Sequence, residues 1–261
     1  MTAKQILLVS NPSSGGSDDE RVSIVEGELR ASGDVRKLQP EGDGADDEVR
    51  SAAGSAGLVV VAGGDGTLHR IVNALEASID DFVFAVIPMG TGNDWARTLG
   101  VPEDPARAAR IAAGGAVRSV DLGRARGAGG VERLFVNACI GGFPVAMNEA
   151  VDQDTKARLG PLAFWLGGAK VAADLPRTTV TLSGVEVRDC IAAGVGNGKT
   201  SGGGVALWPD ADPDDGLLDG CALAAPNIAA AAKLAARLKA GTHEGLDEGA
   251  TTIGRTVTIE S

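Results

Sequence analysis

The chain has 261 residues, of which 44% are hydrophobic, so it is long enough for two modest domains or one large domain around a real core. Acidic residues outnumber basic ones by 35 to 24, and the resulting net charge of −11 disfavours binding to DNA or RNA. Since no apolar run approaches the roughly 20 residues that span a bilayer, we expect an unprocessed, cytoplasmic protein.

The first 120 residues alternate short apolar runs with helical patterns. This alternation predicts an α/β fold, with a mostly parallel sheet covered by helices on both faces. Strands are expected at 4–10, 34–39, 58–64 and 82–88, and helices at 18–32, 45–56, 67–78, 94–99 and 104–115. The last helix has Asp104 as its N-cap, Pro105 at its first position and Gly114 past its end.

From about Leu122 the pattern changes to strands separated by glycine-rich turns, which predicts a second, β-rich and mainly antiparallel domain. Two helices are expected to interrupt it, one around 144–158 and one that Asn227 caps and Gly241 ends. The segment 124–133 is expected to be a flexible hairpin loop.

A glycine-rich turn, GGDGT at 63–67, follows the third predicted strand. The helix N-terminus after it offers free N–H groups and about half a positive charge, which suits a phosphate. The turn is not a dinucleotide fingerprint, because His69 stands where that motif needs glycine, and it lacks the lysine of a P-loop. Asp65 would repel a phosphate, so we expect it to hold Mg²⁺ or to take a proton from an attacking hydroxyl. The alternative is that Asp65 only caps the helix starting at Thr67.

A second turn of this kind, GTGND at 90–94, follows the fourth predicted strand. Ligands of open α/β sheets bind at the carboxyl ends of the strands, so the two turns can bring Asp65, Asp94 and a hydroxyl to one phosphate and metal site. The pair is more specific than either turn alone. The turn SNPSSGG at 10–16 fits a phosphate contact or an ordinary strand-to-helix turn.

The second half holds two further polar clusters. AGVGNGKT at 193–200 is not a P-loop, because that motif requires glycine at Ala193 and the stretch lies in the β-rich half. Four aspartates between residues 210 and 215 precede Gly216 and resemble a hard-cation loop, without the bidentate Glu of an EF-hand. A local Mg²⁺ or Ca²⁺ site and a solvated acidic turn both remain open.

Taken together, these motifs resemble the diacylglycerol kinase catalytic-domain family, which includes bacterial lipid kinases and sphingosine kinases and is distantly related to NAD kinases. The resemblance runs over nearly the whole chain and rests on NPSSGG, GGDGT, PMGTGNDWARTLGVP, VDLG, FVNACIGGF, LGPLAFWLGG, GNGKTSGGG and PDADPDDGLLD. The most specific feature is GGDGT followed about 25 residues later by GTGND.

The resemblance implies an ATP- and Mg²⁺-dependent kinase that phosphorylates a hydroxyl of a diacylglycerol-like lipid. It further implies a nucleotide-binding domain at 1–121, a β-rich domain at 122–261 and an active crevice between them. The implied nucleotide contacts are Asn11, Gly63, Gly64, Asp65, Gly66, Thr67, Thr91 and Asn93. Asp65 and Asp94 are implied to be catalytic and, with Asp121, to surround the catalytic Mg²⁺. A structural metal is implied at the Asp215 side chain and the carbonyls of Asp212 and Leu217.

The chain departs from the family's pattern at two places. His69 and Arg70 stand where the family often has Asn-Glu, and we assign His69 no role. The family usually closes with a DGE segment whose Glu is the proposed general base, whereas this sequence ends at TVTIES and its Glu260 follows no Asp-Gly. Either the sequence is truncated or the base lies elsewhere, with Asp65 as a candidate.

Two rival functions therefore stay open: a phosphotransferase that acts on a soluble nucleotide such as NAD, and a nucleotide-binding protein without turnover. The expected partners are a nucleotide, a lipid substrate and a membrane surface contacted transiently from the cytoplasm. A homodimer is an open alternative, and no nucleic acid is expected.

The acidic excess, 22 Asp and 13 Glu, suggests a halophilic origin, because the Debye length falls to about 3 Å at 1 M salt and self-repulsion is then screened. We predict that the midpoint of thermal unfolding rises as KCl is raised from about 0.1 M to about 2 M. Calorimetry across a KCl series checks this, and a flat response would contradict a halophilic origin.

Overall fold

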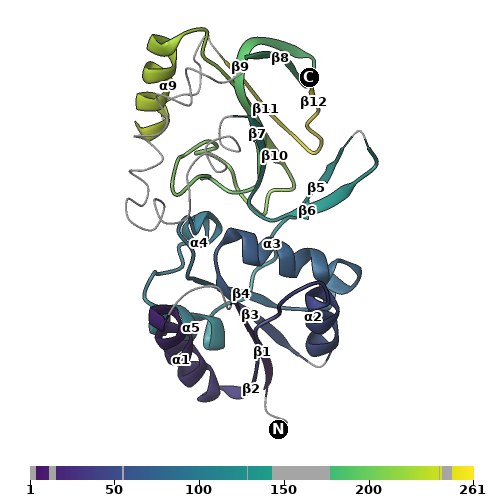
Figure 1. The fold of residues 1–261 in the computed structure, drawn as a ribbon, viewed down its shortest axis with the longest axis vertical. Coiled ribbons are helices and arrows are strands. Elements are labelled where there is room, and N and C mark those ends of the chain that lie inside the picture. The colour runs from purple at the N-terminus through teal and green to yellow at the C-terminus, as the bar shows by residue number, and fades with distance from the viewer. Residues whose placement is uncertain are drawn as a thin grey trace. The chain divides into compact units, whose positions relative to one another are not determined.

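The computed structural model describes residues 4–11, 16–54, 56–127, 129–142, 177–240, 242 and 249–261. The chain divides into two compact units, Met1–Ser119 with Arg124–Val136 and Val120–Gly123 with Asn137–Ser261 (Figure 1). The expected helix at 144–158, the LGPLAFWLGG motif and most of SNPSSGG lie outside the described residues.

The sheet of the first unit consists of four parallel strands in the order β2-β1-β3-β4, as expected for an α/β domain. The strands are β1 Lys4–Ser10, β2 Gly33–Leu38, β3 Leu58–Gly63 and β4 Phe84–Pro88. Ser10 pairs with Ala62, and Gly63 pairs with Pro88. Strands β1, β3 and β4 therefore end level with one another, and the GGDGT and GTGND turns leave the sheet at the edge where β1 also ends.

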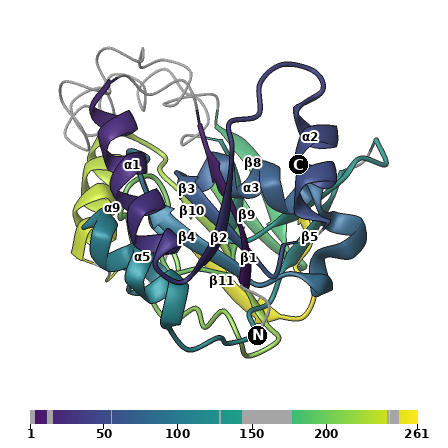
Figure 2. The same cartoon turned by 90° about the horizontal axis from the view of Figure 1, so that it is seen from below.

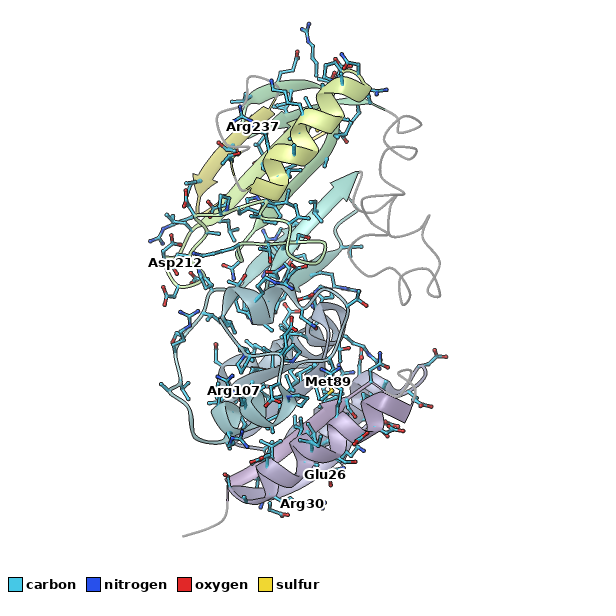
Figure 3. The ribbon with its side chains drawn as sticks, turned by 90° about the vertical axis from the view of Figure 1, so that its left-hand side faces the viewer. Glu26, Arg30, Met89, Arg107, Asp212 and Arg237 are labelled. Atoms are coloured by element: carbon cyan, nitrogen blue, oxygen red, sulfur yellow. The ribbon has the colours of Figure 1, made fainter. Side chains whose placement is uncertain are left out.

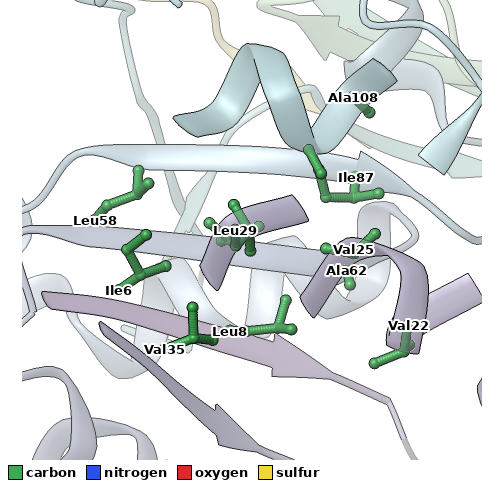
Figure 4. Packing of buried hydrophobic residues seen from close by; sticks show 12 residues of the cluster. Ile6, Leu8, Val22, Val25, Leu29, Val35, Leu58, Ala62, Ile87 and Ala108 are labelled. Carbon is green, nitrogen blue, oxygen red and sulfur yellow. The ribbon is translucent and has the colours of Figure 1, made fainter. Parts of the chain in front are cut away.

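Helices cover both faces of this sheet (Figure 2). Helices α1 Gly16–Arg30 and α5 Pro105–Gly114 lie on one face, and α2 Ala45–Ala53 and α3 Asp65–Ala74 lie on the other. Every residue of β3 is buried, as a strand covered on both faces requires. On the α1 and α5 face, side chains such as Ile6, Leu29 and Ile87 form the core (Figure 4).

The ends of α3 and α5 differ from the sequence expectation. α3 begins at Asp65 rather than Thr67, and it ends at Ala74, after which the 3₁₀ helix η1 covers Glu76–Asp81. In α5 the N-cap prediction is confirmed, since the Asp104 carboxylate accepts from Arg107 N at 2.8 Å, but Gly114 is the last helical residue rather than the one after it. The short helix α4 covers Asp94–Thr98.

The segment expected to be a flexible hairpin loop does form a hairpin, with the strands β5 Gly123–Arg126 and β6 Glu132–Phe135. Asn73 of α3 fastens it, because its amide accepts from Leu134 N at 3.0 Å and donates to Leu134 O at 2.9 Å. Arg124 pairs with both Glu76 and Glu132. The hairpin therefore belongs with the first unit, whereas the sequence places the domain boundary before it, at residues 121 and 122.

The second unit is built on an antiparallel sheet, as the sequence predicts. Its strand order is β11-β10-β9-β8-β12, with β7 also paired to β9. The strands are β7 Ala138–Gly142, β8 Thr178–Leu182, β9 Val185–Gly196, β10 Leu218–Ala224, β11 Gly249–Gly254 and β12 Ile259–Glu260. Helix α9 Ile228–Ala240 packs Leu234 into a core cluster with Trp208 and Leu223. Asn227 caps α9, accepting from Ala230 N at 3.0 Å. No helix in the described part of the chain is long and apolar enough to cross a bilayer.

The three cysteines provide a probe of folding. Cys139 is exposed, whereas Cys190 and Cys221 are buried, and burial raises the pKa of the Cys221 thiol to about 12. The thiolate is the reactive form, so at pH 8 we predict that Ellman's reagent labels Cys139 in the native protein and reaches the other two only in denaturant. Rapid labelling of Cys221 in the native protein would contradict its burial.

Candidate functional site

The two glycine-rich turns of the first unit touch through bare backbone. A Cβ atom added to Gly90 would lie 2.6 Å from Gly64 Cα, and one added to Gly64 would lie 3.1 Å from Gly90 Cα. The contact is reinforced by Met89 N, which donates to Gly63 O at 3.2 Å. Both positions need glycine because any side chain would push the turns apart. The structure thus brings together the GGDGT and GTGND turns that the sequence singled out.

Asp65 bridges these turns. Its Oδ2 accepts from Asp94 N at 3.0 Å, and its Oδ1 accepts from Trp95 N at 2.9 Å. Asp65 therefore caps α4, a helix that begins 29 residues later, and does not cap α3, whose own first residue it is. The alternative in which Asp65 only caps the helix that follows it does not match these contacts, because its carboxylate accepts from N–H groups at the start of α4 instead.

The N-terminus of α3 is consequently left without a side-chain cap among the described residues. Its N-cap is Gly64, and Leu68 N, bonded to Gly64 O at 3.1 Å, is the first N–H paired within the helix. The N–H groups of Asp65, Gly66 and Thr67 precede that bond. Uncapped N–H groups at a helix N-terminus form an anion-binding site.

The side chains of two further predicted nucleotide contacts shape the turns. A Cβ atom on Gly63 would lie 2.7 Å from Thr67 Cβ, so Thr67 packs directly over that glycine. Asn93 adopts the left-handed conformation, with φ of 52°, and its amide accepts from Gly90 N at 2.8 Å and donates to Gly90 O at 2.6 Å. Asn93 therefore closes the second turn. Thr91 in that turn and Asn11 directly after β1 are exposed.

Asp94 is buried, with 4% of its surface exposed, and forms an ion pair with Arg97. Arg97 Nη1 lies 3.0 Å from Asp94 Oδ1 and 3.0 Å from Gly92 O, so one nitrogen serves both acceptors. Sequence reasoning missed Arg97. The available signal was its position three residues after Asp94 in a helix, which places both side chains on one face.

The other predicted metal ligands gather in the second unit. Gly216 N donates to Asp121 Oδ2 at 2.7 Å, and Leu217 N donates to Asp215 Oδ1 at 2.8 Å. Asp121 also donates its own N–H to Pro213 O. Asp121 and Asp215 thus converge on one turn, and Asp212 is exposed in the same loop before β10 (Figure 3). Asp121 lies in the second unit and Asp65 and Asp94 in the first, so its implied place with them around the catalytic Mg²⁺ stays a prediction.

The donors of the first unit fit a nucleotide-borne Mg²⁺. No three His, Cys, Asp or Glu side chains gather as a metal site within the described ranges. A protein usually holds Mg²⁺ through one or two carboxylates, and phosphate and water complete the shell. Asp65 and Asp94 supply two carboxylates, and each Asp65 oxygen that accepts one N–H keeps a further lone pair.

The remaining residues singled out by the sequence lie in ordinary settings. The GNGKT stretch follows strand β9, and no helix occurs in the described segment 197–217, so the rejection of a P-loop is confirmed. His69 is exposed on α3, and its pKa is lowered by partial burial and by Arg133. Arg70 pairs with Asp46 of α2. Glu260 is exposed on β12, opposite Thr181.

Comparison with known proteins gives two family matches that together cover most of the chain. Residues 5–125 match the model of the diacylglycerol kinase catalytic domain, and residues 138–261 match that of the YegS C-terminal NAD kinase beta sandwich-like domain.

Bacterial proteins are among those similar to this chain. A probable lipid kinase YegS-like protein of Pseudomonas putida is 33% identical over 87% of this chain and 76% of its own length. Another of that name from Stenotrophomonas maltophilia is 33% identical over 96% of this chain and 84% of its own length. A crystal structure of a diacylglycerol kinase from Bacillus anthracis superposes with a TM-score of 0.75 at 27% identity, covering 100% of this chain and 87% of that one.

The contact between the turns predicts different outcomes at two glycines. Gly90→Ala is expected to lower the free energy of unfolding by about 1–3 kcal/mol, because its methyl group would overlap Gly64. Gly66→Ala is the matched control: nothing lies within 4 Å of its added Cβ, and alanine in a helix is favoured over glycine by about 1 kcal/mol. Chemical denaturation measures both, and equal stability of the two variants would contradict the close contact.

Proposed function

Since the chain belongs to the diacylglycerol kinase catalytic domain family, we propose that it transfers the γ-phosphate of ATP to a hydroxyl of a diacylglycerol-like lipid, with Mg²⁺ as cofactor. The enzyme class follows from the family: the chain is a phosphotransferase of the lipid kinase type, with an alcohol group as acceptor. The names of the relatives from Pseudomonas putida and Bacillus anthracis support a lipid acceptor.

The observation that carries the proposal is the uncapped N-terminus of α3 beside two carboxylates. Asp65 is drawn to α4 by two N–H groups, which leaves the first N–H groups of α3 for an anion. Phosphate alone would be repelled by Asp65 and Asp94, whereas phosphate with Mg²⁺ meets both needs. A nucleoside triphosphate that carries Mg²⁺ fits this combination of N–H donors and carboxylate charges.

In this proposal the N–H groups of Gly66 and Thr67 bind phosphate oxygens, and Asp65 and Asp94 hold Mg²⁺. The metal would neutralise charge that develops on the transferred phosphoryl group. The nucleotide would also contact Asn11, Thr91 and Asn93.

A second, structural cation is proposed at the turn in the second unit, where the resemblance suggests the Asp215 side chain and the carbonyls of Asp212 and Leu217 as ligands. Asp121 supports the turn from its other side through Gly216 N. Oxygen donors of this kind suit Mg²⁺ or Ca²⁺.

A lipid acceptor also requires access to a membrane surface. We therefore propose a cytoplasmic enzyme that touches the membrane transiently. The net charge of −11 opposes broad contact with anionic lipid, so the contact would be local and assisted by salt.

The test is transfer of labelled γ-phosphate from ATP to a lipid extract. We expect Asp65→Asn and Asp94→Asn each to lose about 100-fold or more in kcat, because each removes a charge that faces the transferred phosphate. Asp104→Asn is the control, since it makes the same change at the N-cap of α5, where Asn caps as well as Asp. Full activity in both site variants would refute the assignment of the two carboxylates.

The same assay separates the alternative functions. Phosphorylation of NAD instead of lipid would indicate an NAD kinase-like enzyme. ATP binding by calorimetry with no phosphorylated product from lipid or NAD would indicate a nucleotide-binding protein without turnover.

A further inference from the structure

We infer that Arg97 is a positioning residue of the phosphate-transfer site, which acts through the Asp94 carboxylate and the Gly92 carbonyl. The inference rests on the proposed function of the same site and adds a residue to it. Arg97 holds the second glycine-rich turn in the form that presents Asp94 beside Asp65.

The first support is the ion pair itself. The Asp94 side chain is 6% exposed and the Arg97 side chain is 40% exposed, so the carboxylate is the buried partner of the pair and the guanidinium the more exposed one. A buried carboxylate is stable only when it is paired or hydrogen-bonded. Removal of Arg97 would therefore take a charged partner from the Asp94 carboxylate and weaken its hold on the position that Mg²⁺ requires.

The second support is the contact with Gly92 O. Asn93 is a non-glycine residue in the left-handed conformation, with φ of 52°, which surrounding contacts must maintain. The Asn93 side-chain amide is hydrogen-bonded to the backbone N–H and carbonyl of Gly90. Arg97 Nη1 donates to the carbonyl of Gly92, the residue before Asn93, at 3.0 Å. Because Nη1 reaches both Gly92 O and Asp94 Oδ1, it fixes the acidic side chain relative to the turn.

These contacts form one connected arrangement. Asp65 holds the N–H groups of Asp94 and Trp95, while Arg97 holds the Asp94 carboxylate. The backbone and the side chain of Asp94 are thus each fixed by a different charged residue. Arg97 should accordingly control the rate of phosphate transfer and leave the affinity for the nucleotide nearly unchanged.

The kinetic experiment compares Arg97→Met, Arg97→Lys and a control. We expect Arg97→Met to lower kcat by about tenfold or more with the KM for ATP within about twofold of the parent value, because misplacement of a catalytic group affects the rate of the chemical step. Arg97→Lys should restore kcat to within about threefold, since an ammonium group carries three donors and can serve both oxygens. The control is Arg110→Met, which breaks the exposed Arg110–Glu28 pair between α5 and α1 and should leave kcat unchanged.

Hydrogen exchange of the 88–98 peptide provides a readout that does not depend on activity. In Arg97→Met the amides of Asp94 and Trp95 should exchange at least about fivefold faster, and in Arg97→Lys and Arg110→Met they should exchange as in the parent protein. If the parent phosphorylates no lipid, the proposed function fails, and the exchange result still decides whether Arg97 positions the turn.

Three results would overturn the inference: unchanged exchange in Arg97→Met, a raised KM for ATP with unchanged kcat, or failure of lysine to rescue either readout. The second result would make Arg97 a direct nucleotide contact. If Arg97→Met does not fold, Arg97→Gln replaces it, because its amide can still donate to one of the two oxygens and should give an intermediate loss in kcat.

Discussion

At Gly64 and Gly90, two turns that leave neighbouring strands approach so closely that a Cβ atom on Gly90 would overlap Gly64 and one on Gly64 would press against Gly90. The parallel register of β3 and β4 places the turns side by side, and the missing side chains allow their backbones to meet. At this separation the Asp65 carboxylate reaches two N–H groups at the start of α4. The anion site and the carboxylate pair are built on that approach, and the Arg97 contacts then fix the second turn locally.

This geometry gives the Asp65 carboxylate a structural role that the sequence alone did not indicate. A carboxylate in a phosphate-binding turn looks repulsive in sequence, and the familiar alternative is a local helix cap. The structure instead uses the charge to cap a neighbouring helix, which leaves the N-terminus of its own helix open. One side chain therefore joins the two turns and preserves the N–H groups that an anion needs.

Much of the fold could be predicted from local patterns. The alternation of strands and helices gave the parallel sheet, and capping rules located Asp104 and Asn227 correctly. The features that the sequence did not predict are tertiary contacts. The contact of Asp65 with α4 spans 29 residues and that of Asn73 with Leu134 spans 61, and neither has a local signature. Arg97 was visible only as an i+3 neighbour of Asp94, a spacing too common to be informative before the burial of Asp94 was known.

The Asn73 amide matches both hydrogen bonds of Leu134, as a neighbouring strand would. These two hydrogen bonds determine which changes in length the hairpin tolerates. Residues added at the exposed turn around Gly129 and Gly130 would lie beyond the fastened part and leave the register intact. One residue added inside β6 would instead shift the strand by one position, so that the side chain at the place of Leu134 would point to the opposite face. Length variation among proteins of this fold should therefore concentrate at the tip of the hairpin and spare its base.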